Sequence, residues 1–293
     1  MKQFISVFSL FFSLFFSLFF SLSTAFGQAA ENVAHGRRFG NFEVGDTSFT
    51  LVSDANVRDK PATSGAVVAK LSIGTWLKIE TVTTDSLTVK GLRAPWYQVS
   101  FTAENKQKKG YLWGGFIASV FMSDVDYKTN EIYQYLGGVA AFDEKNYKLT
   151  SQLRVAKNGQ QVAVLEFPTV GDLNYDPQIE LTSDNGFKNV KQVVSYGMTF
   201  GACDYPQGDY LIFLTKNNQL QKIAETTSSS GAGTGYATET YVLPSHRGGI
   251  NNHILMTEDA AAMEEKGDEY EMRDQKFKVS LWKWNGVKLL KVQ

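Results

Sequence analysis

The chain has 293 residues, a formal net charge of -1 and an aromatic content of 13%. This balance leaves no basic stripe, which excludes nucleic acid and anionic lipid as expected partners. Cys203 is the single cysteine, so no intramolecular disulfide can form and the fold has to be stabilised by packing.

The amino terminus predicts export. An apolar run extends from Phe4 to Leu22, and the small residues Ala25 and Gly27 supply the pattern that a signal peptidase reads. We expect cleavage after Gly27 and a mature protein in the periplasm or outside the cell. The alternative is an uncleaved anchor, because the run approaches the ~20 apolar residues that span a bilayer. In that case the membrane would be contacted only through this segment.

Four sequence marks occur in order between Asn56 and Ile117. They are Asn-Val-Arg-Asp-Lys-Pro at 56–61, Gly-Thr at 74–75, Trp-Tyr-Gln-Val at 96–99 and Gly-Tyr-Leu-Trp at 110–113. Together they resemble the bacterial SH3-like domain, a small β-barrel that usually serves as a targeting or binding module. The resemblance implies such a barrel over residues 49–121, with cell-wall peptide or glycan as its ligand.

Hydrophobic periodicity indicates strands in the same region. Residues 76–80 and 96–101 both alternate between apolar and other side chains, which predicts two strands with one solvent-exposed face each. A long loop is expected between them, from Val82 to Pro95. Short strands joined by loops at this spacing are typical of a barrel or sandwich.

Three tryptophans of this region could present flat apolar faces to a sugar or a peptide, and two polar residues could fix its polar groups. The candidate ligand-binding residues are Asn56, Arg58, Trp76, Trp96 and Trp113. An alternative is that Trp96 and Tyr111 complete the core of a small domain, which needs aromatic mass. Trp76 and Trp113 are therefore the residues we expect to be exposed.

The polar residues 123–130 indicate a boundary, after which a larger β domain is expected. Runs rich in β-branched and aromatic residues predict strands at 152–155, 161–167, 190–196, 209–214, 237–243 and 276–284. Asn158-Gly159 and Asn285-Gly286 lie between strand-like runs and supply the positive φ angles of tight hairpins. One short helix is expected over Thr257–Lys266, which has a capping threonine, early acidic residues and three alanines.

The expected fold class is therefore all-β: a small SH3-like barrel followed by a larger, mostly antiparallel sandwich or barrel with at most one or two short helices. The expected organisation is a signal peptide at 1–27, a poorly structured start of the mature chain at 28–48, the SH3-like domain at 49–121 and the second domain at 131–293.

The glycine-rich segment 226–235 has little to bury and predicts a mobile loop. A phosphate-binding loop would need a strand before it and a helix after it, but the residues that follow resemble a strand. We therefore expect an ordinary surface loop, with a lid as the alternative.

Catalytic and metal sites lack the sequence context that they need. Cys203 is followed by Pro206 and Gly208, so it cannot open the helix on which cysteine peptidases place their thiol. His246 and His253 fall in a loop, without a helix that would aim both imidazoles at zinc.

Two carboxylate clusters also lack the sequence context of a metal or catalytic site. Asp172, Asn174 and Asp176 alternate as in a calcium loop, but Pro177 takes the place of the required glycine and Ser183 that of the closing glutamate. The acidic run 264–271 is expected to be a solvated helix end and loop. We assign no catalytic residue, no metal and no cofactor.

Three functions remain open. The first is an exported, non-catalytic protein that binds cell-wall peptide or glycan, the second is a protein-protein adaptor of the cell envelope, and the third is an unrecognised cell-wall hydrolase. Nothing in the sequence assigns a reaction centre, so we expect a binding protein rather than an enzyme.

Overall fold

The computed structural model describes residues 33–126, 129–182, 186–202, 205–231, 234–266 and 269–292. These residues form an all-β protein of antiparallel sheets, with one 3₁₀ turn (Gly114–Phe116) and no α-helix in the described ranges. Val33–Gln293 forms one compact unit, and the expected signal peptide lies outside the described residues. None of the described segments is a helix of the length and apolarity that a membrane crossing requires.

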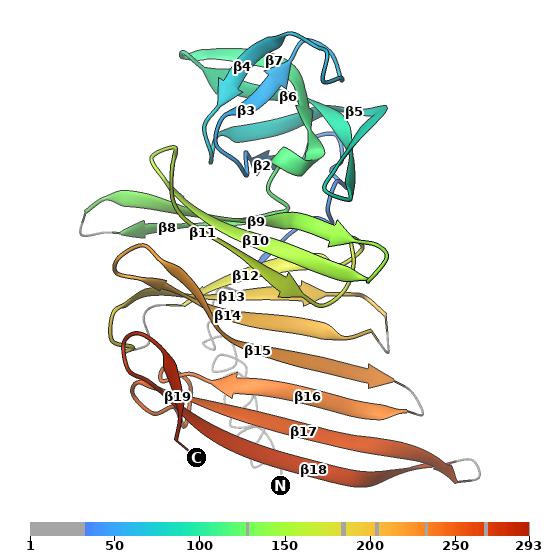
Figure 1. Ribbon diagram of the computed structural model, residues 1–293, viewed down its shortest axis with the longest axis vertical. Helices are drawn as coiled ribbons and strands as arrows, with labels where there is room; N and C mark the ends of the chain where they lie inside the picture. The colour runs from blue at the N-terminus through green and yellow to red at the C-terminus, as the bar shows by residue number, and fades with distance from the viewer. Residues whose placement is uncertain are drawn as a thin grey trace, which may run out of the picture. The chain divides into compact units, whose positions relative to one another are not determined.

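The first part of the chain forms a six-stranded sheet of order β2-β5-β6-β7-β3-β4 (Figure 1). Its strands are β2 (Thr47–Phe49), β3 (Ala55–Arg58), β4 (Val67–Leu71), β5 (Trp76–Val89), β6 (Leu92–Ala103) and β7 (Lys106–Trp113). As predicted, Leu77 and Ile79 point inward, and they pack against Tyr97 and Val99. The prediction of a long loop from Val82 to Pro95 is wrong. Most of that segment extends β5 and β6 into a hairpin that turns at Lys90-Gly91.

A four-stranded sheet of order β11-β10-β9-β8 follows. Its strands are β8 (Val120–Asp126), β9 (Glu131–Asp143), β10 (Lys148–Lys157) and β11 (Gln160–Thr169). The polar residues 123–126 continue β8 and pair with β9, so the change of sheet falls between Trp113 and Val120. The hairpin predicted at Asn158-Gly159 is confirmed, with φ angles of 52° and 74°.

The third sheet has nine strands in the order β1-β12-β13-β14-β15-β16-β17-β18-β19 (Figure 1). Its strands are β1 (Val33–His35), β12 (Asp176–Thr182), β13 (Val190–Thr199), β14 (Gln207–Thr215), β15 (Leu220–Gly231), β16 (Gly235–Val242), β17 (His253–Lys266), β18 (Glu269–Trp284) and β19 (Leu289–Lys291). The hairpin predicted at Asn285-Gly286 is confirmed by the pairing of β18 with β19, but its loop spans residues 285–288 and only Gly286 of the pair has a positive φ, of 100°.

The sequence predicts little structure for residues 28–48, but the chain is ordered from Val33 onward. β1 pairs with β12, the Gly36 amide donates to the Pro177 carbonyl oxygen at 2.8 Å, and Phe42 is buried in the core of the six-stranded sheet. Because these partners lie far away in the sequence, no local pattern reveals them.

The helix predicted over Thr257–Lys266 is wrong. This segment is part of β17, which pairs with β16 on one side and β18 on the other, and ion pairs link Glu258 to Lys278 and Glu264 to Arg273. A ten-residue helix is marginal by itself, so pairing with two neighbouring strands outweighs the helix propensity of three alanines. Glu264 and Glu265 of the acidic run therefore belong to a hairpin strand rather than to a helix end.

The glycine-rich segment 226–235 is likewise no simple loop in its described part. Residues 226–231 end β15 and Gly235 begins β16, and the two strands pair from Ser228 to Thr238. A strand therefore follows this segment, and the strand-to-helix context of a phosphate-binding loop is absent from it.

The largest hydrophobic core gathers side chains from all three sheets. It includes Trp96 and Trp113 from the six-stranded sheet, Leu153 from β10, and Tyr196 and Ile212 from the nine-stranded sheet. As a consequence β6 is covered on both faces, which corrects the prediction that it has one solvent-exposed face.

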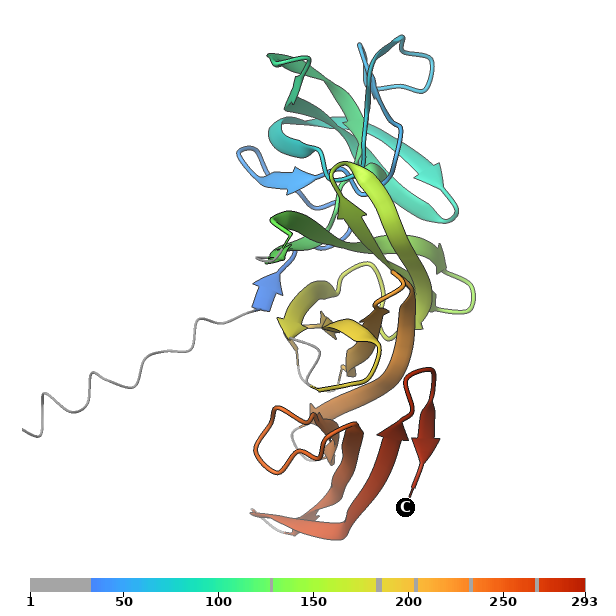
Figure 2. The same cartoon turned by 90° about the vertical axis from the view of Figure 1, so that its left-hand side faces the viewer.

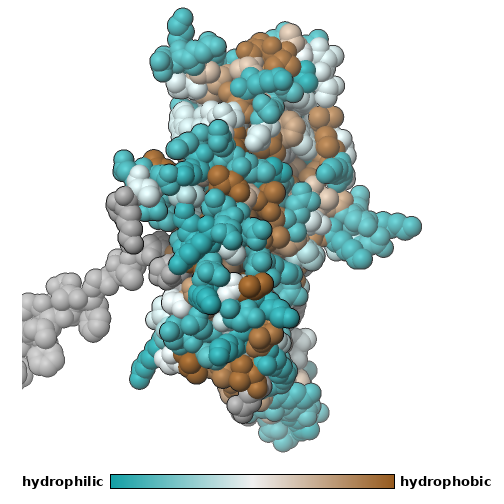
Figure 3. Space-filling view, turned by 60° about the vertical axis from the view of Figure 1, so that its left-hand side comes forward, coloured by the Kyte–Doolittle hydropathy of each residue, from teal (hydrophilic) through white to brown (hydrophobic). Residues whose placement is uncertain are grey.

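The nine-stranded sheet curls on itself towards its β19 edge, as the side view shows (Figure 2). Inside the curl, Val193, Leu211 and Phe213 pack against Leu243, Ile254 and Trp284 and form a separate core. Figure 3 shows one face of the molecule, which is largely hydrophilic with hydrophobic residues in small groups.

Candidate functional site

Two of the three candidate tryptophans are buried and cannot stack on a ligand. Trp96 and Trp113 are each only 4% exposed, and the Trp113 indole N–H lies 3.0 Å from the carbonyl oxygen of Leu87 and 3.2 Å from that of Ala94. Trp113 was expected to be exposed, and that expectation is wrong because the core shared with the other sheets covers it. For Trp96 the core alternative is correct.

The other three candidates lie on two separated strands. Trp76 on β5 is 46% exposed, as predicted. Arg58 on β3 donates to the Gly65 carbonyl oxygen at 2.6 Å, so part of its guanidinium holds its own loop. The Oδ1 atom of Asn56 is buried without a hydrogen-bond partner. Because β6 and β7 lie between β5 and β3 in the sheet order, these residues are not brought together on neighbouring strands.

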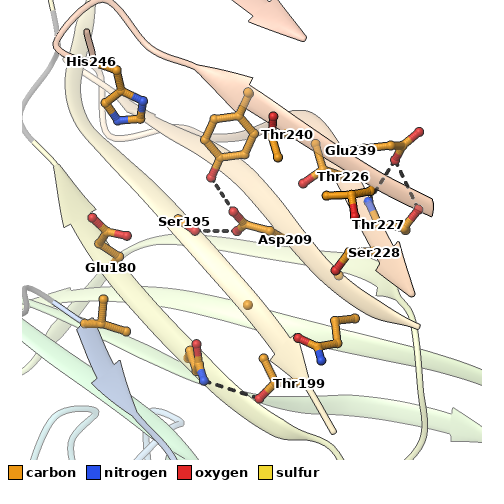
Figure 4. A pocket seen from close by; sticks show the side chains of 17 residues that line it. Glu180, Ser195, Thr199, Asp209, Thr226, Thr227, Ser228, Glu239, Thr240 and His246 are labelled. Carbon is orange, nitrogen blue, oxygen red and sulfur yellow. Dashed lines mark hydrogen bonds between the residues drawn. The ribbon is translucent and has the colours of Figure 1, made fainter. Parts of the chain in front are cut away.

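The structure instead has a cleft with a largely polar lining inside the curl of the nine-stranded sheet (Figure 4). We call it the polar cleft. Its volume is about 450 Å³, and β1 and β12–β16 line it together with His246 from the loop after β16. Its polar side chains include Glu180, Ser195, Asp209, Thr226, Glu239 and Tyr241. This volume is within the range of small-molecule sites, roughly 300 to 1,000 Å³.

Strand alternation explains how β13 builds one wall of the polar cleft. Val194, Tyr196 and Met198 point into the main core, while Ser195, Gly197 and Thr199 line the polar cleft. Gly197 leaves room there, since a Cβ atom added to it would meet only Gln178, at 3.4 Å. The cleft is thus the continuation of the apolar core inside the curl, with small and polar residues replacing the large apolar ones.

Asp209 on β14 lies at the centre of a hydrogen-bonded triad with Ser195 and Tyr241. The Ser195 hydroxyl donates to Oδ1 of Asp209, and the Tyr241 hydroxyl donates to Oδ2 at 2.6 Å (Figure 4). Burial raises the pKa of the Asp209 carboxyl above its ordinary value, although both hydrogen bonds act in the opposite direction. Burial also raises the pKa of the Tyr241 phenol, which therefore stays protonated and remains a donor.

The triad crosses a gap between two strands of the sheet. β15 and β16 pair only from Ser228–Gly231 to Gly235–Thr238, and beyond Thr238 β16 pairs with β17 alone. Two side-chain links bridge the gap: Tyr241 reaches Asp209, and Glu239 Oε2 accepts from the Thr227 amide at 2.8 Å and from the Thr227 hydroxyl at 3.1 Å. These hydrogen bonds therefore connect the two sides of the gap where the backbone pairing of β15 and β16 has ended.

The charge of the cleft decides which ligands it disfavours. Its lining holds the carboxyl groups of Glu180, Asp209 and Glu239, and neither lysine nor arginine. Anionic ligands such as phosphates would meet like charge without a compensating cation. A neutral, hydroxyl-rich molecule or a cation fits these acceptors better.

Among the residues that the structure describes, the sequence candidates for catalysis and metal binding are not assembled into a centre. The Leu243 amide donates to Nδ1 of His246 at 3.3 Å, and Nδ1 of His253 lies 2.7 Å from the Asn251 carbonyl oxygen, while Cys203 is outside the described residues. Asp176, one of the three residues that alternate as in a calcium loop, forms an ion pair with Arg38 at 3.1 Å. Within the described ranges no three His, Cys, Asp or Glu side chains are grouped so that they could hold a metal ion.

Sequence reasoning missed the polar cleft, although one signal for it exists. In Val194–Thr199 large apolar residues alternate with Ser195, Gly197 and Thr199, a pattern of small or hydroxyl-bearing residues on a strand with one buried face. That pattern indicates a solvated face. It does not reveal that Tyr241 and Glu239 lie opposite it.

Comparison of the chain with protein-family models, with curated proteins and with solved structures found no match. The arguments for function therefore rest on the geometry and chemistry of the polar cleft.

Proposed function

We propose that this chain is an exported, non-catalytic binding protein of the cell envelope and that its polar cleft binds a cell-wall glycan. The observation that carries the proposal is the lining of the cleft, in which hydroxyl, carboxyl and amide groups face one another without a lysine or an arginine. Sugar hydroxyls both donate and accept hydrogen bonds, so they match serine and threonine hydroxyls and carboxylate acceptors.

The fixed geometry of the lining supports binding rather than a catalytic cycle. Ser195, Asp209 and Tyr241 already satisfy one another, as do Thr227 and Glu239. Groups held in place before a ligand arrives lose little conformational entropy when it binds, which favours affinity.

The six-stranded sheet gives independent support for an envelope role. The four marks that resemble the bacterial SH3-like domain fall on or next to its strands, and Trp76 still offers an exposed ring. With Trp96 and Trp113 buried, the polar cleft is the better candidate for the principal ligand site.

Cosedimentation of the purified protein with isolated peptidoglycan tests the proposal. Gly197→Val would place an apolar side chain on the wall of the cleft without backbone strain, because its Cβ would make only ordinary contact with Gln178. We expect this variant to stay folded and to lose retention. Thr81→Val, on an exposed position of β5, is the matched control and should be retained like the native protein.

Three results would count against this assignment. Absence of retention of the native protein would remove the wall as the ligand, and unchanged retention of Gly197→Val would remove the cleft as the site. Loss of retention in Trp76→Ala alone would move the site to the six-stranded sheet. If immobilised stem peptides retain the protein but glycan strands do not, the ligand is an amine-bearing peptide rather than a glycan.

Glycoside hydrolysis is the second candidate, because three carboxyl groups line one cleft and burial raises the pKa of one of them. A carboxyl group that holds its proton more tightly is what a general acid requires. Release of soluble fragments from peptidoglycan, abolished by Asp209→Asn, would favour this candidate over pure binding.

A further inference from the structure

A second hollow adjoins the polar cleft and shares part of its wall. Gln207, Ser228 and Thr238 line both, and from these residues the second hollow extends past Ser229 and Ser230 to Phe200 and Tyr205. We call it the outer hollow, and its volume is about 480 Å³. The two hollows adjoin at these three shared residues, and we call the adjoining pair the groove.

The far end of this groove carries aromatic rings that are held in place from behind. We call Tyr175, Phe200 and Tyr205 the aromatic shelf. The ring centroids of Phe200 and Tyr205 are 4.5 Å apart, and those of Tyr175 and Phe200 are 5.3 Å apart. Tyr175 is buried, whereas Tyr205 is 51% exposed, so the shelf has a fixed base and an open surface.

Arg38 supports the shelf from the side. Its guanidinium carbon lies 5.9 Å from the centre of the Phe200 ring, and Asp176 holds the guanidinium by hydrogen bonds of 3.1 and 3.3 Å. An exposed aromatic ring whose neighbour is braced in this way loses little freedom when a ligand stacks on it.

The groove thus combines two kinds of recognition. Around Asp209 it offers hydrogen-bonding groups, and at Tyr205 it offers an apolar ring face. A sugar ring has the complementary pair of surfaces, because its hydroxyls lie at the edge and its C–H groups form an apolar face. The residues between Asp209 and Tyr205 are few, so at about 3.3 Å per residue the two regions are at most roughly 13 Å apart along the chain.

We propose that the aromatic shelf is a stacking subsite, and that the ligand of the groove is a linear oligosaccharide of at least two sugar units, one at the hydrogen-bonding groups around Asp209 and one on the ring of Tyr205. This inference rests on the proposed function, because it takes the polar cleft as a glycan site. It adds the length of the ligand and the direction in which the ligand runs, from Asp209 towards Tyr205.

Calorimetric titration with linear N-acetylglucosamine oligomers of increasing length tests the inference. We expect affinity to rise with chain length until an oligomer spans both hollows and then to level off. Tyr205→Ala should lower the affinity for the longest oligomers by about tenfold and leave the shortest unchanged, whereas Tyr205→Phe should keep the native affinity.

Tyr147→Ala is the matched control, since Tyr147 is 72% exposed in the turn between β9 and β10 and should not affect binding. If oligomers of every length bind equally and Tyr205→Ala changes none of them, the shelf is no subsite while the polar cleft still binds glycan. If no oligomer binds the native protein, both the inference and the proposed glycan function are overturned.

Discussion

The hydrogen bonds among Ser195, Asp209 and Tyr241 should contribute to stability by an amount that depends on pH. Tyr241→Phe removes one hydroxyl and leaves Oδ2 of Asp209 without its donor at 2.6 Å. A hydrogen bond to a charged group contributes about 1.5 to 3 kcal/mol, and one between neutral groups about 0.5 to 1.5 kcal/mol. The variant should therefore lose about 1.5 to 3 kcal/mol of unfolding free energy where Asp209 is ionised, and less where it is protonated.

The sign of the pH dependence follows from the raised pKa of Asp209. Between its ordinary value of 3.8 and the raised native value, the folded protein binds a proton that the unfolded chain has released. The stability contributed by this group is thus present at low pH and is lost as pH rises through that window. Removing the Tyr241 donor raises the native pKa further, so the difference between the variant and the native protein should grow with pH.

Urea unfolding of both proteins between about pH 4 and pH 8 measures this difference. Tyr236→Phe is the matched control, because it deletes the same hydroxyl on the same strand from an exposed hydrogen bond to Asp259 at 3.1 Å. It should change stability little at any pH. A loss in Tyr241→Phe that is independent of pH, or no larger than that of Tyr236→Phe, would refute the role given to the triad.

Three further predictions address the fold. Trp113→Ala should lower the unfolding free energy by about 3 to 5 kcal/mol, because it empties part of the shared core, whereas Trp76→Ala should change it by about 0.5 kcal/mol or less. Comparable urea midpoints for the two variants would contradict the burial of Trp113. Gly36→Ala should lower the unfolding free energy by about 1 to 3 kcal/mol, since the new methyl would lie 2.5 Å from the Ser119 carbonyl oxygen. It should also speed amide hydrogen exchange in β12, the partner of β1, and native-like exchange there would mean that β1 does not pair with β12. Ala262→Val should leave stability unchanged or raise it by up to about 1 kcal/mol in thermal unfolding, because Ala262 is exposed on a strand, and a clear loss would favour the helix instead.

The sequence predicts the parts of this fold that depend on local pattern. Alternation placed Leu77, Ile79, Tyr97 and Val99 inward, and the Asn-Gly pairs at 158–159 and 285–286 marked real hairpins. In each case the physical cause acts within a few residues, because strand periodicity and positive φ angles are local properties.

The failures have a different cause. The alanines of 260–262 favour a helix by themselves, but two neighbouring strands supply hydrogen bonds that no local pattern shows. Trp113 was expected to be exposed, yet side chains from other sheets cover it. The polar cleft depends on β16 leaving β15 after Thr238, and this departure is fixed by the pairing of β16 with β17.

The two buried indoles of the six-stranded sheet also make this sheet dependent on the rest of the protein for its stability. Trp96 and Trp113 complete a core to which β10, β13 and β14 contribute the opposing side chains. A chain cut after Phe121 would keep the strands of the first sheet but leave both rings facing water, and such bare apolar patches promote aggregation. The six-stranded sheet should therefore stay soluble by itself only if both tryptophans are replaced with polar residues.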